Sequence, residues 1–304
     1  MMFDRPKSTF FTARNPGEIL FLLVIVTLFF AGAGSAIAGM IMSQGNIDIL
    51  DAKEAVVLSY DQRMTLRWAN LIGHLSLFTI SSLFVAFMVA RRGQILSFLH
   101  IKNDAWWRNL HLYLGVILAA FPLVLLVNWL NNSLPLPDWA WEMENSQRGL
   151  IEALLVMEYP FEFFFNLLLV AFIPAIGEEL FFRGITQPAL QRLAGNQHLA
   201  VWITAILFSA IHFQFAGFFP RLFLGAVLGY LFLWSQNLIV PIIVHFLYNG
   251  AQIIGVYIMP DAFEQANDVV LPPVYVWLNA AALMALCLYY LYKRRVLMDD
   301  SLSV

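Results

Sequence analysis

The sequence is poor in charge and nearly free of cysteine. Only 12% of its 304 residues are charged, whereas 61% are hydrophobic and the mean hydropathy is +0.73. Soluble proteins carry about 25% charged residues. So few charged side chains cannot cover a soluble surface, which excludes soluble enzymes, nucleic-acid binders and disordered chains. The net charge of −3 supplies no basic field for nucleic acid. The one cysteine, Cys287, lies in an apolar stretch and predicts packing, so disulfide frameworks and thiolate metal clusters are excluded too.

Long apolar segments dominate the chain, and eight of them approach the roughly 20 residues that a transmembrane helix needs. They are expected at Gly17–Met42, Trp68–Ala90, His111–Leu130, Tyr159–Ile176 with a continuation beyond it, Leu199–Phe215, Phe218–Ser235, Leu238–Met259 and Pro273–Tyr292. The predicted fold class is therefore all-α, a polytopic membrane protein with about eight transmembrane helices. No long soluble insertion interrupts it, so residues 1–304 are expected to form a single integral membrane domain. The amphipathic stretch Trp139–Met157 is expected to lie along the outer membrane interface.

Basic residues predict the orientation, because arginine and lysine accumulate on the cytoplasmic side of a membrane. Both termini are expected in the cytoplasm, and the protein in the inner (plasma) membrane. This orientation places 12 of the 17 basic residues inside: Arg5, Lys7, Arg14, Arg91, Arg92, Lys102, Arg108, Arg183, Arg192, Lys293, Arg294 and Arg295. The outer side then holds Lys53, Arg63, Arg67, Arg148 and Arg221. Glu158 and Glu162 are expected at the outer, solvated start of the fourth span.

Polar side chains inside the apolar spans are functional candidates, because burying them in hydrocarbon is costly. Six of them lie on three segments: Glu178, Glu179 and Arg183 follow the fourth, His212 is on the fifth, and His245 and Asn249 are on the seventh. Glu179 and Arg183 are four residues apart on a helix and can pair. Glu178 lies about 100° around that helix and must face another partner. An unpaired carboxylate in a partly dehydrated cavity suits general-base chemistry, and neutral His and Asn donors suit an oxyanion.

The depth of the glutamates depends on the length of the fourth helix. Glu178 can meet His212 only if this helix continues toward Leu190, and we expect that continuation. Pro174 and Pro241 each lie four residues before a polar residue, so they are expected to kink their helices there, although proline is also simply common in membrane helices.

Three motifs, Glu178-Glu179-x-x-x-Arg183, Phe208-x-x-x-His212 and His245-x-x-x-Asn249, together resemble those of the CPBP family. This family includes the CAAX prenyl endopeptidases of the Rce1 type (CAAX prenyl protease 2) and the Abi proteins, with bacteriocin-processing and self-immunity relatives. The motifs occur in the family's order on separate spans. The family-like catalytic core is expected at about 159–259.

The resemblance implies an intramembrane endopeptidase that hydrolyses a peptide bond of a membrane-associated or prenylated, CAAX-type substrate through a glutamate-activated water. In this mechanism Glu178 is the base and His212 helps to hold the water. His245 and Asn249 stabilise the tetrahedral oxyanion.

The resemblance also implies supporting roles. Glu179 and Arg183 would support the site or grip the substrate, and Phe208 would pack beside it. The family is often labelled a metalloprotease, and one carboxylate with two imidazoles could bind zinc, so the metal candidates are Glu178, His212 and His245. A glutamate-activated water without metal fits the sequence equally well, and no firmly bound cofactor is expected.

Other functions stay open at this stage. The same polar groups could form the relay of an ion- or proton-coupled transporter, although the chain shows no internal repeat. A non-catalytic bacteriocin-immunity protein could use the same pocket. The expected partners are the lipid bilayer and a membrane-associated peptide or protein, with no nucleic acid. His74, also inside a span, is assigned to packing or interhelical hydrogen bonding. Gly225 and Gly229 form a GxxxG motif that predicts close helix packing.

Overall fold

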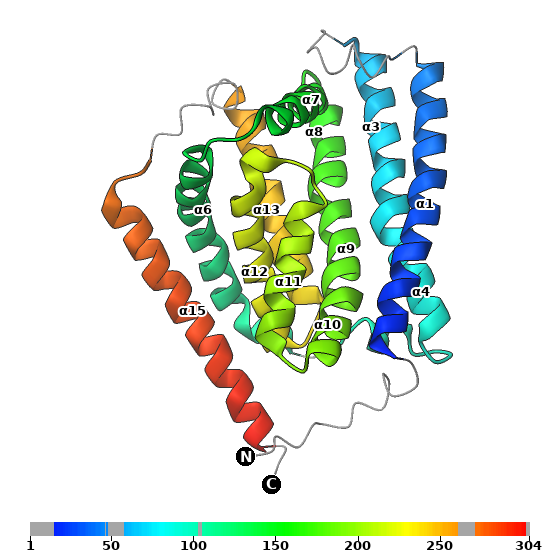
Figure 1. Ribbon diagram of the computed structural model, residues 1–304. Helices are drawn as coiled ribbons and strands as arrows, with labels where there is room; N and C mark the ends of the chain where they lie inside the picture. Colours follow the sequence, from blue (N-terminus) through cyan, green and yellow to red (C-terminus); the bar gives the residue numbers. More distant parts are fainter. Residues whose placement is uncertain (1–14, 46, 48–57, 103–104, 261–270, 302–304) are drawn as a thin grey trace.

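Long antiparallel helices make up the molecule, which a computed structural model describes for residues 15–45, 47, 58–102, 105–260 and 271–301 (Figure 1). Within these ranges there is no strand. Among the described residues, seven helices are long and apolar enough to cross a membrane: Pro16–Gln44, Tyr60–Val89, Trp106–Asn132, Pro160–Ala194, Phe215–Ser235, Ile239–Ile258 and Val274–Val296. The protein is a polytopic all-α membrane protein, as the composition predicts.

Several spans are built from shorter helical pieces joined end to end. In chain order the elements are α1 (Pro16–Gln44), α3 (Tyr60–His74), η2 (Leu75–Ile80), α4 (Ser81–Val89), α5 (Ile95–Phe98), η3 (Trp106–Asn109), α6 (Leu110–Asn132), α7 (Asp138–Leu155), α8 (Pro160–Asn166), η4 (Leu167–Phe172), α9 (Ile173–Glu179), η5 (Leu180–Thr186), α10 (Gln187–Ala194), α11 (Gln197–Ala210), η6 (Phe215–Gly217), α12 (Phe218–Ser235), α13 (Ile239–Ile258) and α15 (Val274–Ser301). The segments η2, η4 and η5 are π-helical turns inside continuous spans. Such turns are frequent at functional sites.

The second span begins at Tyr60, eight residues before the predicted Trp68. Ser59 starts it with a capping box: the Ser59 side chain accepts a hydrogen bond from the Gln62 backbone, and the Gln62 side chain accepts one from the Ser59 backbone. Hydropathy missed this part of the helix because its first turns carry charged residues.

Two of these charged residues, Arg63 and Arg67, are buried and paired with Glu162, which corrects the expectation that Glu162 lies at a solvated outer end of the fourth span. Arg63, Arg67 and Glu162 are all buried. Glu162 Oε1 accepts hydrogen bonds from Arg63 Nε at 2.8 Å and from Arg67 Nη1 at 2.7 Å. Glu158 is exposed as expected and accepts from Arg63 Nη2 at 2.6 Å. A buried charge is tolerated when it is paired and hydrogen-bonded, and a residue-by-residue hydropathy scale does not include such pairing.

The fourth span is one helix from Pro160 to Ala194, so the predicted continuation past Glu178 to Leu190 is confirmed. The fifth segment is shorter than predicted, since α11 has 14 residues and ends at Ala210 instead of Phe215. At 1.5 Å per residue it is about 21 Å long, less than the thickness of the hydrocarbon core. The part of the chain that the structure describes therefore has seven long apolar helices and one short apolar helix where eight spans were predicted.

The chain after α11 turns inside the molecule, beneath α7. Asn131 Nδ2 donates to the carbonyl oxygens of Phe215 and Ala216 at 3.1 and 2.9 Å. Glu144 on α7 accepts from the Ala216 backbone N–H at 3.1 Å. The helix α7 crosses one end of the bundle, in agreement with the predicted amphipathic segment (Figure 1).

The start of α1 and the end of α15 lie at the same end of the bundle (Figure 1), which agrees with termini on one side of the membrane. Which side is cytoplasmic stays a prediction. The basic residues Arg5, Lys7, Arg14 and Lys53, which entered that prediction, lie outside the described residues.

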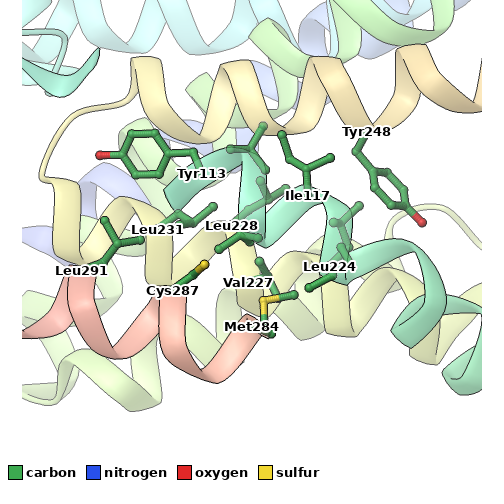
Figure 2. Packing of buried hydrophobic residues seen from close by; sticks show 14 of the residues in the cluster. Tyr113, Ile117, Leu224, Val227, Leu228, Leu231, Tyr248, Met284, Cys287 and Leu291 are labelled. Carbon is green, nitrogen blue, oxygen red and sulfur yellow. The ribbon is translucent and has the colours of Figure 1, made fainter. Parts of the chain in front are cut away.

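Helices α6, α12, α13 and α15 share an apolar core, which Figure 2 shows from close by. Cys287 is buried in this cluster, so its predicted packing role is confirmed. A Cβ on Gly115 would lie 2.7 Å from the Cys287 sulfur. The glycine therefore lets α6 and α15 approach each other closely. This packing fixes α12 and α13, which border the polar site.

Candidate active site

Two neighbouring carboxylates at the end of α9 face different partners. Both Glu178 and Glu179 are buried, with 5% and 0% of their surface exposed. Glu178 Oε1 lies 3.1 Å from His74 Nε2, and Glu178 Oε2 lies 4.0 Å from His245 Nε2. Three helices that are distant in sequence, α3, α9 and α13, therefore meet at Glu178. The prediction that Glu178 faces away from Arg183 and toward other partners is confirmed.

The second carboxylate forms a chain of contacts. Glu179 Oε1 accepts a hydrogen bond from Arg183 Nη1 at 2.7 Å and lies 2.9 Å from His245 Nδ1. Arg183 Nη2 donates to the carbonyl oxygen of Gly225 on α12 at 2.8 Å. Arg183 is fully buried, so its assignment to the cytoplasmic surface is wrong. The carboxylate and the carbonyl provide the partners that make this burial tolerable.

The hydrogen-bond partners assign the tautomers of both imidazoles. The Glu179 carboxylate paired with Arg183 can only accept, so His245 Nδ1 carries a hydrogen and donates it. In the neutral ring, His245 Nε2 is then an acceptor, and in the imidazolium it is a donor. His212 Nδ1 lies 2.7 Å from the carbonyl oxygen of Phe208, which also only accepts. His212 Nε2 is therefore an acceptor in the neutral ring.

Phe208 packs among the charged and aromatic groups of the site, as predicted. Its ring centroid lies 4.9 Å from Arg183 Cζ, within the range of a cation–π contact. The ring centroids of His212 and His245 lie 5.2 and 6.0 Å from that of Phe208. His212 is also within electrostatic range of the Glu178 carboxylate. The fifth segment thus brings its histidine to the same region as the other two motifs.

Asn249 is placed against η4. Its Nδ2 donates to the carbonyl oxygen of Val170 at 3.2 Å. Val170 precedes Pro174 by four residues, and proline has no N–H to complete that helical hydrogen bond. The Asn249 amide supplies a donor to this carbonyl. One of its two N–H groups therefore stabilises the proline-containing turn, and the other is left for a second partner.

His74 also belongs to the site, although none of the three sequence motifs includes it. An interhelical hydrogen bond was one of its two predicted roles, and the structure confirms that role with Glu178 as the partner. The two residues are 104 positions apart, so no local spacing connects them. The only available signal was a histidine inside an apolar span, which is a functional candidate by default.

The proposed metal ligands do not form a metal-binding group in this structure. Among the residues that it describes, no three His, Cys, Asp or Glu side chains are grouped so that they could hold a metal ion. In the predicted set of Glu178, His212 and His245, both histidines use Nδ1 in protein hydrogen bonds, an arrangement that is also usual for metal-binding histidines and leaves Nε2 as the possible ligand atom.

Comparison with known proteins identifies the segment that carries this site. Residues 160–251 match the family model described as Type II CAAX prenyl endopeptidase Rce1-like. This segment is Rce1-like. It contains all seven predicted site residues from Glu178 to Asn249, whereas His74 lies outside it.

Two relatives match over part of this chain. The Uncharacterized protein YpbD of Bacillus subtilis (strain 168) is 27% identical over 89 residues, which are 28% of this chain and 42% of that protein. The Membrane-embedded CAAX protease MroQ of Staphylococcus aureus (strain USA300) is 28% identical over 100 residues, which are 31% of this chain and 40% of that protein. The matches thus span about two fifths of the length of these relatives. No solved structure matches.

Proposed function

We propose that this chain is an intramembrane endopeptidase in which Glu178 activates a water to hydrolyse a peptide bond of a membrane-associated substrate. The observation that carries the proposal is the buried pair of atoms Glu178 Oε2 and His245 Nε2, 4.0 Å apart. This separation is too long for a direct hydrogen bond and suits one bridging water. The Rce1-like segment and the name of MroQ support proteolysis as the reaction.

Glu178 is the general base in this mechanism. Its Oε2 takes a proton from the water as the water oxygen attacks the carbonyl carbon of the scissile bond. His212 Nε2, an acceptor in the neutral ring, accepts a hydrogen bond from the other O–H group of the water. The protonated Glu178 then gives its proton to the leaving amine, which breaks the C–N bond and restores the carboxylate.

His245 and Glu179 stabilise the charge that develops on the substrate oxygen. Glu179 accepts from His245 Nδ1 and so orients the imidazole, and His245 Nε2 is the proposed donor to the oxyanion, a role that requires a hydrogen on both ring nitrogens. Arg183 balances the charge of Glu179 and fixes its orientation. The free N–H of Asn249 is the proposed second donor, which requires substrate binding to bring the oxyanion within its reach.

The proposed substrates are peptides held at the membrane, including prenylated CAAX-type tails. The site lies in the middle of a 35-residue span, so the scissile bond must enter the bundle. We propose that it enters from the cytoplasmic side of the inner (plasma) membrane, since the predicted orientation places both chain ends there.

The proposal is tested with the purified full chain in proteoliposomes and a panel of fluorescently tagged peptides, with and without a farnesyl group on cysteine. Wild type is compared with Glu178→Gln and His212→Ala. Glu152→Gln is the matched control, because Glu152 is a solvent-accessible glutamate paired with Arg148 on α7. We expect wild type and the control to cleave at least one peptide, and both site variants to lose about 10²–10⁴-fold in rate.

Two results would overturn the proposal: no cleavage of any peptide by folded wild type, or cleavage by Glu178→Gln at the rate of the control. Proton flux that depends on Glu178 without any proteolysis would instead favour a transporter. Activity that persists after chelation, with zinc measured in the same sample, would establish hydrolysis without metal.

A further inference from the structure

Among the described residues, a histidine from outside the Rce1-like segment lies closer to the carboxylate of the proposed base than His245 does. His74 is the last residue of α3, and its Nε2 lies 3.1 Å from Glu178 Oε1. The carboxylate accepts, so His74 Nε2 carries the hydrogen and donates it. Its Nδ1 is buried and has no hydrogen-bond partner among the described residues. The one hydrogen bond of this ring is thus made to Glu178.

The ring of His74 is held firmly in place. It packs against Phe78, with ring centroids 4.9 Å apart, and Phe78 is itself buried. It also lies close to Gly177 on α9, where an added Cβ would be 3.4 Å from His74 Cε1 and 2.6 Å from Thr79 Oγ1. The absence of a side chain at Gly177 lets α3 and η2 lie directly against the residue that precedes the base.

This contact determines which oxygen of the carboxylate is available. His74 occupies Oε1, so Oε2 is left facing His245 Nε2 across the 4.0 Å gap. A carboxylate without this hydrogen bond could rotate about its terminal torsion, which has a broad energy minimum. It could then turn Oε2 away from the gap in which the proposed water lies.

We infer that His74 is a positioning residue for the reaction: its Nε2–H holds Oε1 of Glu178 so that Oε2 faces the water and the scissile bond. This inference rests on the proposed function. It assigns a role in the site to the second span, which the family match at residues 160–251 does not include. A catalytically competent site would therefore require the first half of the chain as well as the Rce1-like segment.

The test uses the full chain in proteoliposomes with a peptide that wild type cleaves. His74→Leu removes the donor, and His74→Gln keeps an N–H donor at the same distance along the side chain. His198→Gln is the matched control, because His198 also makes one 3.1 Å side-chain hydrogen bond, to Tyr230, but at an exposed position. All rates are expressed per folded molecule, counted by size-exclusion chromatography.

We expect His74→Leu to lower kcat about tenfold or more, the effect of losing one charge-assisted hydrogen bond, with KM changed less than threefold. His74→Gln should recover most of kcat, and His198→Gln should match wild type. The inference is overturned if folded His74→Leu keeps the wild-type kcat while Glu178→Gln is inactive. If Glu178→Gln is active, the proposed function itself is wrong.

Discussion

Removing the buried guanidinium of Arg183 should destabilise the protein more than removing both charges of its ion pair. In Arg183→Met, Glu179 loses its 2.7 Å cationic partner and keeps the 2.9 Å hydrogen bond from His245 Nδ1, while its Oε2 already has no hydrogen-bond partner among the described residues. The Gly225 carbonyl loses its 2.8 Å donor as well. An uncompensated buried charge costs about 3–5 kcal/mol. The double variant Glu179→Gln/Arg183→Met has no such charge, so we expect it to recover about half of that loss or more.

The assay is reversible unfolding in mixed detergent micelles, followed by tryptophan fluorescence, for wild type, both single variants and the double variant. The four free energies of unfolding form a double-mutant cycle. We expect a coupling energy of at least about 1 kcal/mol between the two sites, since contacting residues in one network typically couple by 0.5–3 kcal/mol. If the effects of the two single variants simply add, the pair is not coupled and the reasoning about the buried charge is refuted.

Three further predictions concern other positions. Gly177→Ala should destabilise the protein by about 1–3 kcal/mol and lower the cleavage rate, because the new Cβ would lie 2.6 Å from Thr79 Oγ1. Gly32→Ala is the control, because a Cβ there would have nothing within 4 Å, and equal melting temperatures of the two variants would contradict the prediction. Burial lowers the pKa of His100 from 6.5 to about 4, so between these values the unfolded chain binds more protons than the folded chain, and the free energy of unfolding should fall by up to about 3 kcal/mol as the pH falls through that window. The variant His100→Asn, whose side chain suits the positive φ of 57° at this position, should flatten this pH dependence in a thermal-unfolding series. An unchanged slope would refute the assignment. Glu162→Gln should lower the free energy of unfolding by several kcal/mol, because two buried arginines share that carboxylate. The kcat per folded molecule should stay within about twofold of wild type. A large loss of kcat would show that the pairing at this end of the span also affects the site.

The apolar spans and the pairing of neighbouring charges were predictable from the sequence because both depend on local order. The spacing of Glu179 and Arg183 predicts a contact that the structure confirms at 2.7 Å. The motif of Gly225 and Gly229 predicts close packing, and a Cβ on Gly229 would lie 2.9 Å from Val201 on α11. The structure adds that these two glycine carbonyls accept hydrogen bonds from Arg183 and Gln187.

The errors of the sequence analysis share one physical origin. Hydropathy treats a charged residue as solvated, so it cut the second span at Trp68 and placed Glu162 in water. The actual free energy of such a residue depends on a partner from another helix, which a linear pattern does not specify. The contact of His74 with Glu178 was missed for the same reason, since tertiary packing alone brings α3 to α9.

The most direct test of the central claim separates peptide binding from bond cleavage in Glu178→Gln. A fluorescent peptide that wild type cleaves is mixed with excess enzyme, and its Kd and single-turnover cleavage rate are measured for the variant and for the Glu152→Gln control. The proposed mechanism predicts a Kd within a few-fold of wild type and a cleavage rate about 10²–10⁴-fold lower for Glu178→Gln. A cleavage rate within twofold of the control would show that Glu178 is not the base.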